Sequence, residues 1–324
     1  MLATRLLRVT DQQGYPDQQG YSGSRGFAGN DLFPQRRPTR RPPTLHPGGR
    51  HRRDVPVSLP QDAPALVLAV PGVSTDLTSG TVGDLLTVMR VDNPAVDVRG
   101  ARIEGSADDP EGIHAVLAAV AEARPEGDPC AVVVPLLAAP HPMVIRKLRQ
   151  AIASSGVNAL VSGFANSNAL IAEALHIRLA EAGLARADRV RLFSIVTAAD
   201  GIIVATVGGP DAAQAANVTS VLLAARLALP VFTASLDSSP TVEEVAMRLK
   251  EMGVSRLAIA PCVIGPEARR ADLEAMATSG ECAPPIGAHA NIAKLAAVTY
   301  GNVLAQMEIS QMELSEQELP EDQA

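Results

Sequence analysis

Four blocks of sequence recur in the same order in the two halves of this chain, and this internal repeat is the feature that most limits how it can fold. The paired blocks are 66–72 and 203–209, 109–120 and 239–249, 131–140 and 257–266, and 163–175 and 287–298. "AVVVPLLAAP", for example, parallels "LAIAPCVIGP", with both prolines in register. The spacing between paired blocks shrinks from 137 to 124 residues, as small loop deletions would make it. The two halves are therefore expected to form similar folded units.

Within each half, short apolar runs alternate with stretches of helical periodicity. Continuous apolar, β-branched runs, which predict strands, occur at 65–70, 96–103, 131–137, 159–163, 201–207, 230–236 and 256–264. Helical stretches lie among them, at 82–91, 110–123, 141–156, 168–183, 215–228 and 241–253. Runs that are apolar throughout indicate strands covered on both faces, and hence parallel sheets. We expect an α/β fold of two similar lobes, each a parallel sheet flanked by helices, facing one cleft.

The composition changes sharply at both ends of the repeat. Residues 1–60 carry ten Arg, no Lys and four Asp, a net charge of +6, in a segment rich in Gly, Pro and Gln. That composition buries too little apolar surface to fold, so we expect a disordered basic arm. The two lobes are predicted at 61–188 and 189–309. Residues 310–324, with five acids and no base, are predicted to form an acidic disordered tail.

The basic arm has two interpretations. Its arginines are interleaved with Tyr15, Tyr21, Phe27 and Phe33, which suits RNA, an anionic membrane surface or another acidic partner. The alternative is a solvated tail, or sequence upstream of the true start. A nucleic acid or other anionic partner is therefore expected only through this arm.

Composition argues against several other classes of protein. No apolar run approaches the roughly 18 to 20 residues needed to cross a bilayer, and polar sequence rather than a signal-peptide core follows Arg5 and Arg8. Cys130, Cys262 and Cys282 have no CxxC or zinc-like spacing, which favours reduced thiols in a cytoplasmic protein. Because the duplication supplies both lobes from one chain, we expect a monomer.

The histidine in "VVVPLLAAPHPMVIRKL" stands at the carboxyl end of a predicted strand, where parallel α/β folds place their ligands. This residue, His141, could ligate a metal or accept a proton near pH 7; a helix cap or a solvated loop residue is the alternative. Glu267 is its counterpart in the second half and could contribute a carboxylate to the same metal site. His289 precedes another helix and either lines the cleft or caps that helix. His114 and His176, within predicted helices, are expected at or near the surface.

Residues at the other strand ends complete the candidate site. The candidate substrate-binding residues are Gly72, Ser74, Asp76, Gly208, Gly209 and His289. No GxGxxG, GxxxxGK[ST] or GxSxG motif occurs, so we expect neither a nucleotide cofactor nor a hydrolase nucleophile elbow. "DSS" at 237–239 could hydrogen-bond a ligand, but it equally suits a helix N-cap before Pro240.

Taken together, these motifs resemble the sirohydrochlorin chelatase family, in the long two-repeat form common in actinobacteria. The likeness covers about residues 64–306 and rests on "LVLAVPGVS", on the "VVVPLL" block with His141, and on "APPIGAHANIAKLAAVTYGNVL". It implies a cytoplasmic lyase of cobalamin or siroheme biosynthesis that inserts a divalent metal into a polycarboxylate tetrapyrrole. The metal, Co²⁺ or Fe²⁺, would be a substrate, with His141 as its ligand or as the base.

One position departs from that family's pattern. The family's first histidine would fall on Pro71, which neither ligates a metal nor accepts a proton. Asp76 or Glu267 would then have to supply the missing group. Two functions follow from the resemblance: a metal chelatase acting through His141, or a catalytically degenerate relative that binds a tetrapyrrole, a metal or a protein partner without inserting the ion. Whether the protein is an enzyme stays open between them.

Overall fold

The computed structural model describes residues 63–72, 76–104, 109–124, 129–163, 168–186, 199–265, 267–279 and 281–317. The chain divides into two units, Met1–Val55 and Pro56–Ala324, and all of the described residues belong to the second. The predicted basic arm and Ser74 lie outside the described residues, as do residues 318–324.

The first half of the repeat forms a four-stranded parallel sheet. Its strands lie in the order β2-β1-β3-β4 and are β1 (Ala65–Val70), β2 (Val98–Arg102), β3 (Ala131–Pro135) and β4 (Ala159–Val161). The helices between them are α1 (Asp76–Asp92), α2 (Ile113–Ala123) and α3 (Pro142–Ser155). Successive residues of β1 pack on opposite faces of the sheet: Val67 joins the core under α2 and α3, and Leu66 joins the core under α1. Both faces are covered, which explains why β1 is apolar throughout.

The second half repeats this arrangement, strand for strand. Its strands lie in the order β6-β5-β7-β8 and are β5 (Gly201–Thr206), β6 (Val231–Ser235), β7 (Leu257–Pro261) and β8 (Glu281–Cys282). Its helices include α5 (Pro210–Leu227), α6 (Val242–Glu251) and α7 (Arg270–Ser279). Even the register agrees, because Ala69 lies beside Pro135 in one sheet and Ala205 lies beside Pro261 in the other. The predicted fold class, two similar parallel α/β lobes, is confirmed.

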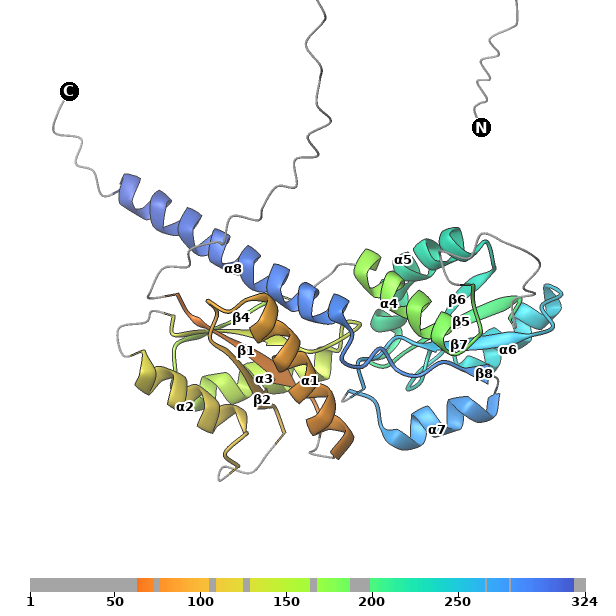
Figure 1. The fold of residues 1–324 in the computed structure, drawn as a ribbon, viewed down its shortest axis with the longest axis horizontal. Coiled ribbons are helices and arrows are strands. Elements are labelled where there is room, and N and C mark those ends of the chain that lie inside the picture. Colours follow the sequence, from red (N-terminus) through yellow and green to blue (C-terminus); the bar gives the residue numbers. More distant parts are fainter. Residues whose placement is uncertain are drawn as a thin grey trace, which may run out of the picture. The chain divides into compact units, whose positions relative to one another are not determined.

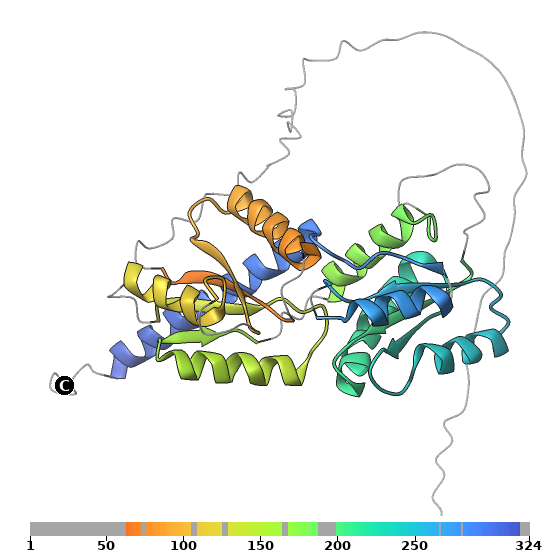
Figure 2. The same cartoon turned by 90° about the horizontal axis from the view of Figure 1, so that it is seen from below.

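The last helix of each half packs on the sheet of the other half. Helix α4 (Asn168–Glu181) follows β4 but contacts α5 and β7 of the second lobe. Helix α8 (Ala290–Gln317) follows β8 but contacts α1 and β3 of the first lobe, as both cartoon views show (Figures 1 and 2). The two helices also touch each other. A whole helix thus crosses in each direction between the lobes. The predicted boundary between the lobes, at residues 188 and 189, stays a prediction.

This exchange joins the two lobes through a shared apolar core. One cluster of buried side chains contains Leu66 of β1 and Ile202 of β5, together with Leu175 of α4 and Ile292 of α8. Burying a side chain of this size contributes about 1.5–3 kcal/mol relative to leaving it in water. Separating the lobes completely would therefore expose a large part of the core of each.

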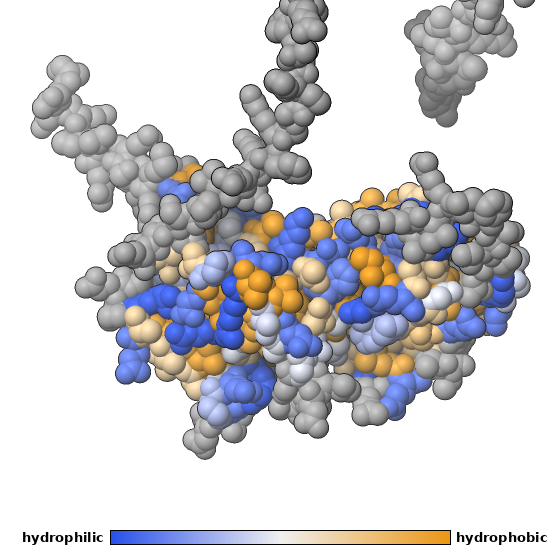
Figure 3. Space-filling model, in the orientation of Figure 1, coloured by the Kyte–Doolittle hydropathy of each residue, from blue (hydrophilic) through white to orange (hydrophobic). Residues whose placement is uncertain are grey.

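The surface is mixed in character. Hydrophobic residues are dispersed among hydrophilic ones on the face seen in Figure 3. The exposed apolar side chains include Val91 of α1 and Val221 of α5. None of the helices in the described ranges is both long enough and apolar enough to span a membrane.

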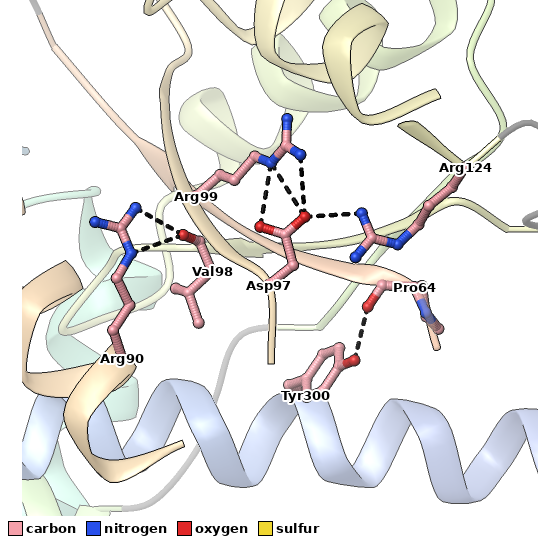
Figure 4. Close-up of polar contacts among 7 residues, drawn as sticks. All are labelled: Pro64, Arg90, Asp97, Val98, Arg99, Arg124 and Tyr300. Atoms are coloured by element: carbon pink, nitrogen blue, oxygen red, sulfur yellow. Dashed lines mark hydrogen bonds and ion pairs between the residues drawn. The ribbon is translucent and has the colours of Figure 1, made fainter. Parts of the chain in front are cut away.

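Polar contacts fix α8 on the first lobe near the amino end of β1 (Figure 4). The hydroxyl of Tyr300 donates a hydrogen bond to the carbonyl oxygen of Pro64 at 2.7 Å. Tyr300 is buried, and burial raises the pKa of its phenol to about 12. Close by, burial alone would raise the pKa of Asp97, but hydrogen bonds from Arg99 and Arg124 outweigh it and lower that pKa.

The structure departs from the sequence-based expectation in three places. We predicted a disordered tail from residue 310, which is wrong for its first part, because α8 continues to Gln317. Met, Glu, Gln and Leu are strong helix formers, so the sequence of this segment favours a helix. The two-residue strand β8 and helix α7 were not predicted, since neither has a clear apolar period. His176, expected near the surface, is buried, with its Nε2 2.6 Å from the carbonyl oxygen of Arg186.

Replacing Tyr300 by Phe should lower the free energy of unfolding by about 1 kcal/mol, because the buried carbonyl of Pro64 then loses its donor. Urea unfolding followed by circular dichroism measures the difference. Val298→Ala, at an exposed position of the same helix, is the matched control and should change stability by less than about 0.5 kcal/mol. Equal stability of Tyr300→Phe and the wild type would show that this bond does not secure α8.

Candidate functional site

Loops at the carboxyl ends of strands from both lobes meet where the lobes join. The loop after β3 lies directly against the loop after β5, at Gly208. A side chain at Gly208 would place its Cβ 2.5 Å from the carbonyl oxygen of Pro140 and 3.2 Å from the Cα of His141. Only glycine fits such an approach, and the φ of Gly208, 115°, also favours glycine.

Backbone groups of Ala138, in the same loop, face the second lobe. The thiol of Cys262, which directly follows β7, lies 3.9 Å from the carbonyl oxygen of Ala138. The N–H of Ala138 acts on the carboxyl group of Glu267 and lowers its pKa. Ala138 is itself buried, so these two groups of the second lobe lie against a part of the loop that water does not reach.

Glu267 also closes the loop to which it belongs. Its Oε1 accepts a hydrogen bond from the N–H of Ile264 at 2.6 Å, and its Oε2 accepts one from the N–H of Gly265 at 2.9 Å. Burial raises the pKa of Glu267, and these backbone hydrogen bonds oppose that effect without cancelling it. Burial also raises the pKa of the neighbouring Cys262 to about 12, and the charge of Glu267 acts in the same direction. The carboxyl group that we predicted as a metal ligand is therefore engaged by backbone N–H groups of its own loop.

A second carboxylate occupies the start of α5. Asp237, two residues after β6, accepts hydrogen bonds from the N–H groups of Gly208 and Gly209, each at 3.0 Å, and from the hydroxyl of Ser235 at 2.7 Å. Burial alone would raise the pKa of Asp237, but these hydrogen bonds outweigh it and lower that pKa. The positive end of the helix dipole also favours a negative charge here. The two glycines predicted to bind substrate thus hold a carboxylate of the chain itself.

His141 stands beside this carboxylate but belongs to the other lobe. It is the N-cap residue of α3, it is half-buried, and its side chain makes no hydrogen bond to the start of the helix. Its Nδ1 is buried and has no hydrogen-bond partner in the described part of the chain. Burial lowers the pKa of His141 most, the charge of Asp237 opposes it, and the resulting pKa lies below the ordinary 6.5. At pH 7 the imidazole is therefore neutral.

Other charges near His141 or Asp237 are held in ion pairs. Lys147, one turn into α3, contacts Glu104. Arg269 of the second lobe donates two hydrogen bonds to Asp272, each at 2.8 Å. Among the charged groups that act on the pKa of His141, Asp237 has the largest effect. The electrostatic character of this region is therefore set mainly by one carboxylate.

The remaining predicted residues are placed less centrally or only in part. The Nδ1 of His289 accepts a hydrogen bond from the N–H of Asn291 at 3.0 Å, so His289 caps α8, which was one of its two interpretations. Gly72 follows β1 with a φ of 82°. Asp76 begins α1, but its side chain lies outside the described residues, as does the whole of Ser74.

Sequence reasoning missed the groups that actually join the loops. Nothing in the sequence marks Ala138 or Cys262, because their roles arise from contacts between residues 124 positions apart. Asp237 was noticed only as part of "DSS", with a helix cap as the equal alternative. The structure gives the capping role to Thr241, whose side chain accepts a hydrogen bond from the N–H of Glu244, and leaves Asp237 at the junction.

No family model matches the chain, and no curated protein matches it. Among solved structures, it is similar to a candidate LacI transcriptional regulator from Bacteroides fragilis, at 9% identity over 60% of this chain and 69% of that chain, with a TM-score of 0.26. It is similar to a periplasmic ribose ABC transporter from Conexibacter woesei, at 13% identity over 67% of this chain and 69% of that chain, with a TM-score of 0.28. A candidate branched-chain amino acid ABC transporter from Rhodospirillum rubrum shares 12% identity over 68% of this chain and 64% of that chain, with a TM-score of 0.24. At these TM-scores the likenesses carry no argument about function.

The expectation of a sirohydrochlorin chelatase is wrong. No family model and no curated protein matches the chain, and the three solved structures named above are not described as chelatases. The motifs behind the resemblance are mostly strand and helix patterns, which any duplicated parallel α/β fold shares. Metal insertion, the tetrapyrrole substrate, a role in cobalamin or siroheme biosynthesis and the degenerate relative are therefore set aside.

The metal expectation also lacks support from geometry. No group of three or more His, Cys, Asp or Glu side chains within the described ranges is arranged to hold a metal ion. The individual roles given to His141 and Glu267, and the expectation of no nucleotide cofactor, are not tested by these findings and stay predictions.

Replacing Gly208 by Ala should destabilise the protein by roughly 1–3 kcal/mol more than replacing Gly253 by Ala, because only the first substitution forces a methyl group into the opposing loop. Gly253 is the matched control: it also has a positive φ, 93°, but nothing lies within 4 Å of its missing Cβ. Its substitution should cost about 1–2 kcal/mol from backbone strain alone. Chemical unfolding of both variants measures the difference, and equal losses would argue against the close approach of the loops.

Proposed function

We propose that the protein binds a small polar molecule, uncharged or cationic, at the junction of its lobes, and that His141 and Asp237 contact it. The observation that carries this proposal is the buried Nδ1 of His141, which has no partner among the described residues. Parallel α/β folds place ligands beyond the carboxyl ends of their strands, and His141 lies at that position after β3.

An unpaired buried polar atom is uncommon in folded proteins. About nine in ten or more such groups have a hydrogen-bond partner in the protein or in ordered water. Leaving one unpaired costs about 1–3 kcal/mol. A ligand that pairs with the Nδ1 of His141 would recover that free energy on binding.

His289 provides an internal comparison. Both histidines stand at the start of a helix, and the Nδ1 of His289 is satisfied locally by the N–H of Asn291. His141 is followed by Pro142 at the first helical position, and its ring does not cap α3. Of these two histidines, only the one at the junction thus has a buried ring nitrogen without a partner among the described residues.

Asp237 has capacity left for a ligand. A carboxylate offers about four acceptor positions, and the N–H groups of Gly208 and Gly209 and the hydroxyl of Ser235 use three of them. Asp237 is also exposed at the surface. A neutral imidazole adds one donor and one acceptor. These groups suit a ligand that carries hydroxyl or amino groups, and the negative charge of Asp237 disfavours an anion.

Three further expectations stay part of this proposal and are not tested directly: the cellular location, the oligomeric state and an anionic partner. Cys130, Cys262 and Cys282 are all free thiols, which supports a cytoplasmic location. A single chain supplies both lobes, which supports a monomer. Binding of nucleic acid or another anionic partner through residues 1–60 concerns residues that the structure does not describe.

Thermal unfolding of the full chain with three small probes tests the proposal. Xylose represents neutral polyols, ethylamine represents cations and acetate represents anions. We expect xylose or ethylamine to raise the unfolding temperature, because a ligand that binds only the folded state stabilises it. Acetate should have no such effect.

In His141→Ala the affinity for the active probe should fall about tenfold, which corresponds to about 1.4 kcal/mol, within the range for a lost hydrogen bond. His114→Ala is the matched control, since His114 is exposed and its Nε2 pairs with Ser154 at 2.9 Å. Binding that survives unchanged in His141→Ala, or stabilisation by acetate alone, would contradict the proposal.

A further inference from the structure

We propose that two copies of this protein associate through α5, whose outward face carries an apolar stripe that is exposed in the single chain. The stripe consists of Val218, Val221, Leu222 and Ala225. This inference does not rest on the ligand proposed above, and its test uses none.

The four side chains of the stripe share one face of α5. Their spacing in the sequence, three, four and seven residues from the first, is the spacing of neighbours along a helix. Val218 is 53% exposed, Val221 67% and Leu222 40%, whereas Leu223 on the opposite face is fully buried. Single exposed apolar residues are ordinary, but a continuous group of them is typical of an interaction surface.

Helix α5 lies at the margin of the second lobe. It packs on α4, β5 and β6, and it stands at the upper edge of that lobe in Figure 1. Since β6 is the edge strand of its sheet, a partner approaches α5 from this side without displacing another strand.

The first lobe provides an internal comparison. Helix α1 holds the equivalent place, because it follows the first strand of its sheet and is covered by α8 as α5 is covered by α4. The exposed residues of α1 include Asp84, Thr87 and Arg90, with a single valine, Val91, near its end. The fold therefore does not require an apolar outward face on this helix, and the stripe of α5 needs an explanation of its own.

The charges of α5 favour a second copy as the occupant. The helix has one acidic residue, Asp211 in its first turn, and one basic residue, Arg226 in its last turn, with no charge between them. These two residues lie seven and eight positions from Val218. Two antiparallel copies of α5 that cross near Val218 therefore bring the Asp211 of each beside the Arg226 of the other.

The same arrangement buries the centre of the stripe. Val218 and Val221 of one copy then lie against Val218 and Val221 of the other, where no charge opposes the contact. This is the self-complementary geometry of a two-fold dimer. The two ion pairs at its ends fix the orientation of the helices.

Other occupants suit this surface less well. Residues 1–60 carry a net charge of +6, and α5 offers their arginines a single carboxylate, that of Asp211. Helices that lie on membranes carry Lys and Arg along their polar face, whereas Arg226 is the one basic residue of α5.

The expected dimer is weak. Helix α5 has 18 residues and is about 27 Å long, so a pair of such helices falls at the low end of specific interfaces, below about 1,200 Å². The expectation of a monomer rests on a different observation, the presence of both lobes in one chain. The following experiment decides between the two.

Sedimentation velocity of the full chain, at concentrations rising to about 1 mM, tests the inference. We expect the average mass to rise from that of one chain towards that of two. A mass that stays at one chain up to about 1 mM would overturn the inference.

Val221→Glu should raise the dissociation constant about tenfold or more, because it brings two like charges together at the centre of the contact. Val91→Glu is the matched control: it places the same charge at a valine that is 74% exposed on α1, and it should leave the association unchanged. Equal effects of the two substitutions would count against α5.

A charge reversal tests the orientation of the two helices. Asp211→Arg should weaken the association, because it faces the Arg226 of the other copy. Adding Arg226→Asp to the same chain should restore it, since both ion pairs then form with their charges exchanged. A double variant that associates no better than Asp211→Arg would contradict the antiparallel arrangement.

A second measurement covers the case in which Val221→Glu does not fold. Mild oxidation should link two chains of Val218→Cys through a disulfide, because the two Val218 positions lie beside each other at the centre of the contact. Val91→Cys is the control, and the native Cys130, Cys262 and Cys282 are present in both variants. Equal cross-linking of the two variants would overturn the inference. So would a monomeric wild type that binds phospholipid vesicles through Val221, because the stripe would then belong to a membrane surface.

Discussion

Neither sheet of this protein is covered by the helices of its own half alone, and this constraint governs the rest of the structure. Helix α4 leaves the first sheet to pack on α5, and α8 leaves the second sheet to pack on α1. The apolar core that results includes strands of both lobes. Two units that could have been independent are thereby made to fold as one, and their strand ends are brought into contact.

The chemistry of the junction follows from that contact. Loops that would face solvent in a single lobe here bury Ala138, Cys262 and part of Glu267 against one another. Each polar group so buried needs a partner, and most have one. The Nδ1 of His141 does not. The hydroxyl oxygens of Ser162 and Ser220 are also buried without a partner among the described residues, but it is His141 that lies where the loops after β3 and β5 meet, which is why this contact is the candidate functional site.

The sequence predicts the fold class and most of the strands of the repeat, because continuous apolar runs and a fourfold match of blocks depend on short-range pattern. It does not predict the order of the strands within each sheet. It also places His141 and Glu267 at strand ends. It does not predict that α4 and α8 exchange sheets, since that exchange depends on contacts between residues far apart in the sequence. It gives Asp237 no special weight, because its role depends on Gly208 and Gly209, 28 or 29 residues earlier. The chelatase assignment failed for the same reason. Apolar sequence patterns predict strands and helices, whereas function depends on contacts between residues that are distant in the sequence.

The hydrogen bond between Tyr300 and Pro64 joins residues 236 positions apart, so it can form only late in the synthesis of the chain. Most chains complete their amino-terminal domain while the ribosome is still working. Here the first sheet lacks one of its covering helices until α8 emerges, and the 236 residues between Pro64 and Tyr300 take roughly 10 to 50 s at 5–20 residues per second. During that interval the face of β1 that carries Leu66 is covered by α1 but not by α8, so part of the apolar core of the first lobe stays open until the second lobe has been made.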